Sequence, residues 1–362
     1  MTTSTVQYLV FACILLSAYP IYMLYNSSAT GEREASKMET ETFPLLQKIS
    51  SAMRLSPEKP RLSIDLSHGF RFGNRLFDVA SLYGIADTLG RQPVYYVQDW
   101  KFRDLILFTS KIMPGLFDQL LFINDTRPTA KRQVMFQELC CLYEDPNNFK
   151  DIRDPHLHLS GRYFISYKYF HHLRHKLLDY LKPPEDFPHL PHSNEETAVL
   201  CIHVRRTDFL DGARQASNEK FIRKATDYIV KQESRNTTRR ITTVLFGDDV
   251  KFEKNLFSGA VVAHPHIRPD NSTSIFVSTN KPEQDLLYAS QHCDVVFMSA
   301  PVSTFGWWMA YLSRHNYAYY VDIRNTNDIS YRTGTLNPHD FYVPTWKPLK
   351  MEKDGRIVEA KF

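Results

Sequence analysis

The sequence predicts an α/β protein built from two folded halves that follow an N-terminal membrane segment. The chain has 362 residues, which is long for a single ordinary core. Strand and helix patterns alternate in its second half, and a run near its N-terminus carries no charged side chain. The net charge of +4 is small and no long Lys/Arg run is present, so the sequence does not indicate a nucleic-acid partner.

Residues 8–25 are predicted to form a transmembrane signal anchor, preceded by a short cytoplasmic tail of residues 1–7. The run is about 18 residues long, at the lower end of the range for a spanning helix. The alternative is a cleaved signal peptide, whose apolar core is usually shorter. Residues 26–60 are polar and are predicted to form a stem. Both alternatives send the rest of the chain into the secretory pathway.

Two further features agree with a lumenal body. Asn-x-Ser/Thr sequons begin at four positions, and glycosylation is predicted at all of them except Asn26, which lies against the membrane: Asn124, Asn236 and Asn271. Outside the apolar run the chain has four cysteines, Cys140, Cys141, Cys201 and Cys293. Four cysteines allow three pairings, and the sequence does not choose among them.

The first half, residues 61–182, begins with a predicted strand over residues 61–66 and a glycine-containing turn. A helix follows from about residue 74 to residue 89 and ends before Gly90, a usual C-cap residue. Residues 93–97 resemble a second strand, and residues 163–181 carry apolar and aromatic side chains at helical spacing. Residues 183–196 are rich in proline and are predicted to link the two halves.

The second half, residues 197–330, is predicted to contain a parallel sheet with helices on both faces. Its predicted strands are residues 198–204, 241–246, 261–264, 295–298 and 318–321. Its predicted helices are residues 217–232, 282–291 and 303–313. The tail of residues 331–362 has little periodicity, and part of it is expected to pack back across both halves.

The segment His203-Val-Arg-Arg-Thr-Asp208 ends a predicted buried strand, where an α/β domain places its ligand. The planar guanidinium group of arginine can donate hydrogen bonds to two phosphate oxygens. The Arg205-Arg206 pair therefore indicates a site for a diphosphate or another dense anion. The alternative is a surface salt-bridge network. One arginine of the pair can also contact phosphate while the other pairs with Asp208.

A second loop, Ser303-Thr-Phe-Gly-Trp-Trp308, opens a predicted helix whose N-terminal N–H groups can hold a phosphate. Ser303 can cap this helix, contact ligand, or do both. The sequence contains no Asp-x-Asp pair of the kind that holds a cation against a nucleotide sugar. Positive side chains are therefore expected to replace the metal, and no metal site or other cofactor is predicted. The P-loop and Gly-x-Ser-x-Gly patterns are also absent.

These segments belong to a series of motifs in a fixed order. The series consists of Phe70-Arg-Phe-Gly-Asn74, Asp151-Ile-Arg-Asp-Pro155 with Leu159-Ser-Gly161, Tyr169-Phe-His-His-Leu-Arg174, His203-Val-Arg-Arg-Thr-Asp208, Gln284-Asp-Leu-Leu287, Ser303-Thr-Phe-Gly-Trp-Trp308 with Ala310-Tyr-Leu312, and Phe341-Tyr-Val-Pro-Thr-Trp346. In these motifs the chain resembles the galactoside α-1,2-fucosyltransferase family, from about residue 61 to residue 346. Two positions depart from the family pattern: Phe70 replaces a glycine, and Thr207 stands where glycine is frequent, as in the α-1,6-fucosyltransferases.

The resemblance implies two Rossmann-like domains that face each other across a cleft, a GT-B-like arrangement. It implies an inverting, metal-independent transfer of L-fucose from GDP-fucose to the 2-hydroxyl of a terminal galactose on a glycoprotein or glycolipid. The implied location is the Golgi membrane, as a single-pass type II protein with a lumenal catalytic body. The alternatives are a GDP-fucose-dependent transferase with another linkage, and a membrane-anchored pseudoenzyme that binds glycan or nucleotide without turnover.

The resemblance also implies roles for individual residues. The donor is expected to contact His203, Arg205, Arg206, Asp285, Ser303, Thr304, Phe305 and Gly306. The catalytic residues are expected to be Arg205, Arg206, Asp208 and His68. For proton removal from the acceptor, His68 and Asp65 flank the loop of the first half that faces the cleft. For His68, the favoured alternative is a turn residue without chemistry. For Asp285, a candidate for guanosine recognition, the alternative is a helix-surface carboxylate.

Overall fold

The computed structural model describes residues 59–66, 72–96, 109–123, 131–137, 139–161, 163–264 and 274–361. All of these ranges belong to one compact unit, Leu55–Phe362. The predicted tail, membrane span and most of the predicted stem lie outside the described residues. Among the helices within these ranges, none is long and apolar enough to cross a membrane.

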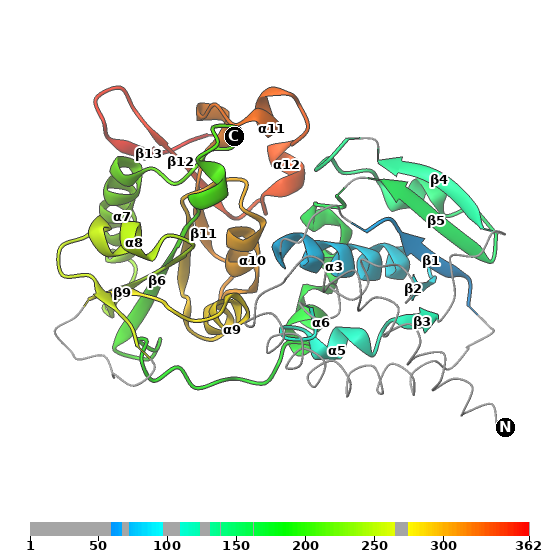
Figure 1. Cartoon of the computed structure of the whole chain (residues 1–362), viewed down its shortest axis with the longest axis horizontal. Helices are drawn as coiled ribbons and strands as arrows, with labels where there is room; N and C mark the ends of the chain where they lie inside the picture. The colour runs from blue at the N-terminus through cyan, green and yellow to red at the C-terminus, as the bar shows by residue number, and fades with distance from the viewer. Residues whose placement is uncertain are drawn as a thin grey trace, which may run out of the picture. The chain divides into compact units, whose positions relative to one another are not determined.

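The first half contains a five-stranded sheet with the order β3-β2-β1-β5-β4 (Figure 1). Every pair of neighbouring strands is parallel. The strands are β1 (Arg61–Ile64), β2 (Gln92–Tyr96), β3 (Leu121–Ile123), β4 (Arg132–Gln137) and β5 (His156–Gly161). The two predicted strands are confirmed within two residues, and three further strands complete the sheet.

The helices of the first half begin with α3 (Phe72–Thr88), close to the predicted bounds. The predicted helical stretch 163–181 is instead divided into 3-10 turns and one short helix. The short elements of this half are α5 (Pro114–Phe117), η1 (Pro146–Phe149), η2 (Tyr167–Tyr169), η3 (His171–Leu173) and α6 (Arg174–Asp179). Tyr163 has a positive φ of 55°, and the Ser166 side chain caps η2, so a continuous helix cannot begin there.

The second half contains an eight-stranded sheet with the order β13-β12-β11-β10-β6-β7-β9-β8. Its strands are β6 (Thr197–Val204), β7 (Arg240–Gly247), β8 (Val261–Val262), β9 (Ile275–Val277), β10 (Val295–Met298), β11 (Ala318–Val321), β12 (Lys347–Met351) and β13 (Ile357–Glu359). All neighbours are parallel except β12 and β13, which are antiparallel. The predicted α/β class with parallel sheets is therefore confirmed.

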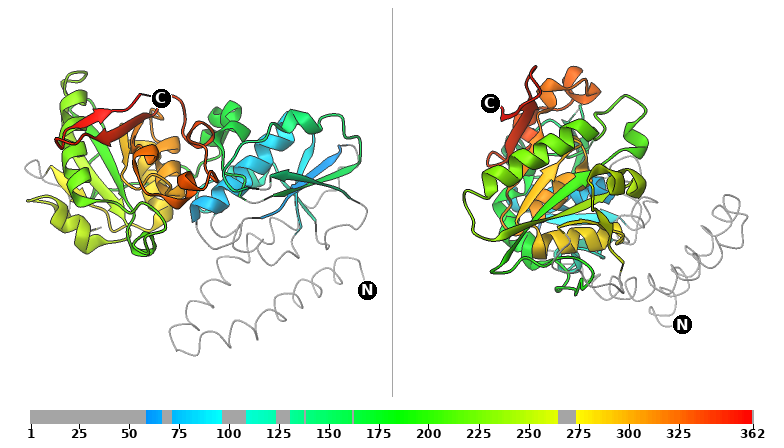
Figure 2. Two further views of the ribbon diagram at one scale, coloured as in Figure 1. Left: turned by 90° about the horizontal axis from the view of Figure 1, so that it is seen from above. Right: turned by 90° about the vertical axis from the view of Figure 1, so that its left-hand side faces the viewer.

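Helices cover both faces of this second sheet, with α7 on one face and α9 on the other (Figure 2). The helices are α7 (Glu219–Glu233), α8 (Val250–Leu256), α9 (Pro282–His292), α10 (Thr304–Leu312), α11 (Ile329–Arg332) and α12 (Pro338–Phe341), with the 3-10 turns η4 (Thr207–Phe209) and η5 (Ile323–Asn325). The three predicted helices correspond to α7, α9 and α10, and α8 was not predicted.

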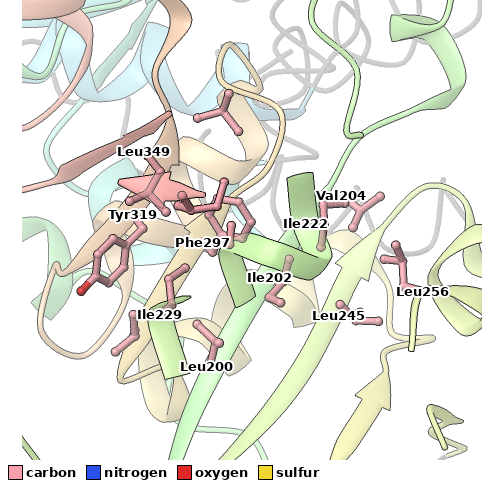
Figure 3. Close-up of a cluster of buried hydrophobic side chains, with 14 of the residues drawn as sticks. Leu200, Ile202, Val204, Ile222, Ile229, Leu245, Leu256, Phe297, Tyr319 and Leu349 are labelled. Atoms are coloured by element: carbon pink, nitrogen blue, oxygen red, sulfur yellow. The ribbon is translucent and has the colours of Figure 1, made fainter. Parts of the chain in front are cut away.

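The core beneath α7 follows from the alternation of side chains along β6 and from the helical repeat of α7. Alternate residues of β6, Leu200, Ile202 and Val204, point to one face of the sheet, where Ile222 and Ile229 of α7 meet them (Figure 3). All five side chains are buried. The intervening residues of β6 point to the opposite face, and among them is the donor-site candidate His203. The alternation along β6 thus separates the structural core from the face that carries the ligand chemistry.

The structure pairs the four cysteines as Cys201–Cys293 and Cys140–Cys141. The first disulfide joins β6 to the residue that follows α9, and both of its cysteines are fully buried. The second joins neighbours in the segment between β4 and η1.

The tail contacts both halves of the chain. Strands β12 and β13 extend the second sheet beyond β11. Helix α12 instead reaches the first half: Lys168 Nζ lies 2.6 Å from Asp340 Oδ1, and Ser166 Oγ donates to the Asp340 carbonyl. Asp340 therefore connects the end of the chain to the first half.

Candidate functional site

A cavity of about 620 Å³ lies beside the N-termini of α3 and α10. Such a volume is within the usual range for small-molecule sites. Its lining comes from both halves and the tail: Phe72, Gly73, Asn74, Cys140, Cys141, Tyr163, Ile165, Arg205, Phe209, Arg214, Pro282, Val302, Ser303, Thr304, Phe305, Ser330, Leu336 and Phe341. Segments far apart in the sequence therefore meet at one site.

Among the described residues of this lining, the charged side chains are all positive. Arg205 and Arg214 face the cavity, and no described lining residue is an aspartate or glutamate. The hydroxyls of Ser303 and Thr304 lie on the same cavity, at the N-terminus of α10. Because a helix N-terminus adds partial positive charge and N–H donors, this combination favours an anionic ligand.

Arg205 is oriented by two carboxylates behind it. Its Nε donates to Asp208 Oδ1 at 2.9 Å and lies 3.2 Å from Asp248 Oδ2. Both contacts use Nε, and among the described residues no hydrogen bond of the Arg205 Nη atoms is present. Asp208 is not among the lining residues of the cavity, and the structure places it as a support for Arg205.

Asp248 is a site residue that the sequence analysis missed. Its carboxylate accepts the Arg206 backbone N–H at 2.9 Å and the Thr207 hydroxyl at 2.5 Å, and it also faces Arg205. It therefore holds the loop that follows β6. The signal was present in the sequence, because Asp248 comes directly after the strand β7 that neighbours β6. Carboxyl ends of parallel strands meet at one edge of a sheet.

Arg206 does not line the cavity. Its guanidinium carbon lies 3.9 Å from the centroid of the Phe252 ring, and its Nη1 donates to the Ser217 carbonyl at 2.9 Å. Its Nε lies 3.5 Å from Asp249. The structure thus separates the two arginines that the sequence placed together: Arg205 faces the cavity, and Arg206 packs beneath the loop.

Ser303 both caps a helix and lines the cavity, and its predicted contact with the ligand stays a prediction. Its Oγ accepts the Gly306 N–H at the start of α10 and lies 2.7 Å from His203 Nε2. Burial and the nearby Arg205 charge lower the pKa of His203 to about 3, so this imidazole is neutral at physiological pH. His203 is buried and off the cavity, where it supports Ser303 from behind.

Gly306 is explained by packing against His203. A Cβ at this position would lie 2.2 Å from His203 Cδ2. Gly306 is buried and off the cavity, whereas its neighbour Phe305 lines it. Gly306 thus meets a structural requirement for close approach to His203, and its predicted ligand contact stays a prediction.

The Gly73-Asn74 pair joins the two halves at the cavity. Thr304 Oγ1 donates to Asn74 Oδ1 at 2.9 Å, and Trp308 Nε1 donates to the Gly73 carbonyl at 2.9 Å. A Cβ on Gly73 would lie 2.6 Å from the Thr304 carbonyl carbon. The side chain of Phe77 then packs on Trp308, with ring centroids 5.1 Å apart. These contacts fix the start of α3 against the start of α10.

The remaining predicted residues have different outcomes. Asp285 is buried and accepts the Ser278 hydroxyl at 2.7 Å, so it is not a surface carboxylate. Burial raises its pKa well above the usual range. It is not among the lining residues of the cavity, and its contact with guanosine stays a prediction. His68 lies outside the described residues. Asp65 Oδ1 lies 3.2 Å from His158 Nε2.

The other predictions concern glycosylation and metals. Asn236 follows α7 and is exposed, as a modified sequon must be. The sequons at Asn124 and Asn271 lie outside the described residues. In the part of the chain that the structure describes, no group of three or more His, Cys, Asp and Glu side chains could hold a metal ion.

Comparison with known proteins identifies the family. The glycosyl transferase family 11 profile matches residues 45–350. The chain belongs to glycosyl transferase family 11. A Caenorhabditis elegans protein named "putative glycosyltransferase" is 37% identical over 90% of this chain and 87% of its own. Two further proteins of that organism are similar: a "putative galactoside 2-alpha-L-fucosyltransferase" (37%, covering 80% of this chain and 79% of its own) and a "galactoside 2-alpha-L-fucosyltransferase" (35%, 79% and 76%).

The predicted family is therefore confirmed, and with it the prediction that this family 11 protein is an enzyme of the fucosyltransferase class. Membership implies a nucleotide-sugar donor and a glycan acceptor. Because a transferase must bring these two molecules together, the cavity is a candidate site for both. The identity of donor and acceptor and the linkage formed are inferences from the site.

Proposed function

We propose that this family 11 protein transfers L-fucose from GDP-fucose to the 2-hydroxyl of a terminal galactose, with inversion and without a metal ion. The observation that carries the proposal is the described lining of the cavity, in which Arg205, Arg214 and the hydroxyls of Ser303 and Thr304 come together at a helix N-terminus and no described residue adds a carboxylate. Such a lining suits the diphosphate of a nucleotide sugar. The names of the relatives at 35% and 37% identity support the fucosyl group and the galactoside acceptor.

The reaction needs this positive charge at one place. As the bond between fucose and phosphate breaks, positive charge develops on the sugar and negative charge on the departing diphosphate. Arg205 stabilises that negative charge through its Nη donors, and the hydroxyls of Ser303 and Thr304 assist from the start of α10. Since these groups are already held in place by Asp208, Asp248 and helix capping, little reorganisation accompanies the step.

The two arginines have different parts in this proposal. Arg205 binds the diphosphate, whereas Arg206 is a positioning residue that holds the loop after β6 through Phe252 and Ser217. The ion pairs with Asp208 and Asp248 hold the Arg205 guanidinium group in its orientation toward the cavity. The acceptor hydroxyl attacks from the face of the fucose opposite the diphosphate and loses its proton as it does so. A strongly dissociative step requires little help from a base.

We also propose that the protein is a single-pass type II protein of the Golgi membrane, with residues 8–25 as the anchor and the body in the lumen. The support is the uncharged run in the sequence and an exposed sequon at Asn236. Endoglycosidase treatment of the protein from cells, with and without Asn236→Gln, reports whether this face enters the lumen. An unglycosylated wild-type protein would contradict the proposed topology.

The function is tested by incubating the full-length protein with GDP-fucose, excess EDTA and a panel of β-galactosides. We expect fucose transfer, with an α-1,2 linkage in the NMR spectrum of the product. Another linkage would correct the acceptor position while retaining the donor. Complete loss of activity in EDTA that added metal restores would contradict the metal-independent mechanism. Failure of GDP to bind to well-folded protein would contradict the proposed donor.

A further inference from the structure

The described residues that the first half contributes to the cavity lining are uncharged. They contribute the Cys140–Cys141 disulfide, the ring of Tyr163 and the side chain of Ile165. The two arginines of the described lining, Arg205 and Arg214, and the hydroxyls of Ser303 and Thr304 come from the second half. The cavity therefore has one wall suited to an anion and another suited to a neutral ligand.

The backbone of the uncharged wall is strained at two positions. In the described chain the non-glycine residues with positive φ are Cys141 (65°), Tyr163 (55°) and Asn316 (47°). The left-handed region costs a bulky residue such as tyrosine about 1–3 kcal/mol, and such residues concentrate at functional sites. Two of these three residues line the same cavity. The strained backbone thus presents both side chains on one surface.

Hydrogen bonds from elsewhere in the fold hold this strained segment in place. The Tyr143 N–H donates to Asp340 Oδ2 at 3.1 Å, and the Glu144 N–H donates to the Tyr169 hydroxyl at 3.2 Å. Tyr169 also donates to the Leu142 carbonyl. Asp340 belongs to α12, so the tail of the chain positions the segment that carries the disulfide. The wall is therefore preorganised before any ligand binds.

We propose that the Cys140–Cys141 disulfide and the Tyr163 ring form a platform on which the acceptor hexose places its apolar face. The proposal rests on the proposed function, since the acceptor must share the cavity with a donor bound at Arg205. One face of a galactopyranose presents C–H groups, and polarisable sulfur and aromatic carbon both favour contact with such a face. Because the platform carries no charge, it suits a neutral glycoside better than an anionic one.

The geometry of an inverting transfer supports the same assignment. The acceptor hydroxyl must approach the fucose from the side opposite the diphosphate. With the diphosphate at Arg205 and Ser303, the acceptor is directed toward the wall that the first half supplies. Cys140 and Cys141 lie on that wall, so removing the platform should weaken acceptor binding and leave GDP binding unchanged.

Saturation-transfer NMR on the full-length protein tests the platform without requiring turnover. The probe is methyl β-D-galactopyranoside, with GDP affinity measured on the same samples by calorimetry. The Cys140→Ala/Cys141→Ala variant should bind the galactoside about tenfold more weakly and GDP equally well. The matched control is Cys201→Ala/Cys293→Ala, which removes a buried disulfide whose cysteines are not among the described lining residues; samples that remain folded should retain galactoside binding.

A second pair of variants keeps the test valid if the disulfide variant does not fold. Tyr163→Gly removes the ring while glycine accepts the positive φ without strain. Asn316→Gly makes the same backbone change at the other left-handed position, away from the cavity lining. We expect weaker galactoside binding in Tyr163→Gly and unchanged binding in Asn316→Gly.

Equal galactoside binding in the wild type, in Tyr163→Gly and in the disulfide variant would overturn the platform. Absence of saturation transfer from the wild-type protein to the galactoside would overturn it as well. Failure of the proposed donor has a different signature, because calorimetry would then detect no GDP binding to the wild type. The galactoside signal is recorded both with and without GDP, so the two failures are distinguishable.

Discussion

Replacement of Arg205 by alanine should remove most of the transferase activity, whereas replacement of Arg206 should mainly destabilise the fold. Arg205 lines the cavity and offers its Nη donors to the departing diphosphate. A hydrogen bond to a charged group contributes about 1.5–3 kcal/mol, so the loss of two costs about 3–6 kcal/mol. This corresponds to a decrease of about 10²–10⁴-fold in kcat/KM.

Arg206 contacts Phe252 and the Ser217 carbonyl instead of the cavity. Its loss should lower the free energy of unfolding by about 1–3 kcal/mol. The decrease in kcat/KM should be smaller than for Arg205→Ala, because the loop keeps its contacts with Asp248. A suitable control is Arg223→Ala, since Arg223 is an exposed arginine of α7 that pairs with Glu219.

The assay combines kcat/KM for GDP-fucose, calorimetric GDP affinity and urea unfolding for the three variants. The reasoning would be refuted if Arg206→Ala lost as much GDP affinity as Arg205→Ala while unfolding at the wild-type urea concentration. It would also fail if Arg205→Ala retained wild-type GDP affinity. Either result would show that the orientation of the two side chains does not determine their roles.

Three other predictions concern the framework of the site. Gly73→Ala should lower both the stability and the activity, because the added Cβ would lie 2.6 Å from the Thr304 carbonyl carbon at the start of α10. Thermal unfolding measures the loss of stability, and Asp87→Ala, at an exposed position of the same helix, is the control. Glu253 is fully buried, and burial raises its pKa to about 7. The folded state therefore holds a proton that the unfolded state has lost, so stability falls as pH rises from about 4.5 to 7. Glu253→Gln should therefore unfold at a higher urea concentration than the wild type at pH 8. A lower urea midpoint for the variant would contradict burial as the cause of the raised pKa. Cys201→Ala/Cys293→Ala opens a link across 92 positions of sequence and should lower the free energy of unfolding by about 4–5 kcal/mol in urea, so an unchanged midpoint would show that the disulfide adds no stability.

Five strands of the second half, β6, β7, β8, β10 and β11, were predictable because each is a short apolar run between turn signals, whereas β9 was not predicted. The bounds of β10 and β11 agree with the prediction, and β6 begins one residue earlier. Strands β12 and β13 were not predicted from sequence. Lys347–Met351 contains two lysines and a proline, and it becomes a strand by adding to the edge of β11.

The spacing of apolar and aromatic side chains over residues 163–181, which predicted one helix, does not arise from a continuous helix. The aromatic spacing there serves packing between the halves: Phe170 stacks on Trp308 of α10 with ring centroids 5.5 Å apart, and it also meets Phe77 of α3. Packing against two helices sets the spacing, while the positive φ of Tyr163 prevents a single helix. Local periodicity cannot distinguish these two causes.

The sequence by itself determined the α/β class, the strands that carry the ligand loops, and the family, because ordered motifs and apolar periodicity are local properties of the chain. It also identified Arg205, Ser303 and Thr304, which line the cavity. Only the tertiary structure decided which way each side chain points. Arg205 and Arg206 are chemically identical neighbours, and they separate because Asp208 and Asp248 hold one while Phe252 holds the other. Orientation depends on partners distant in sequence, and those partners meet only when the chain is folded.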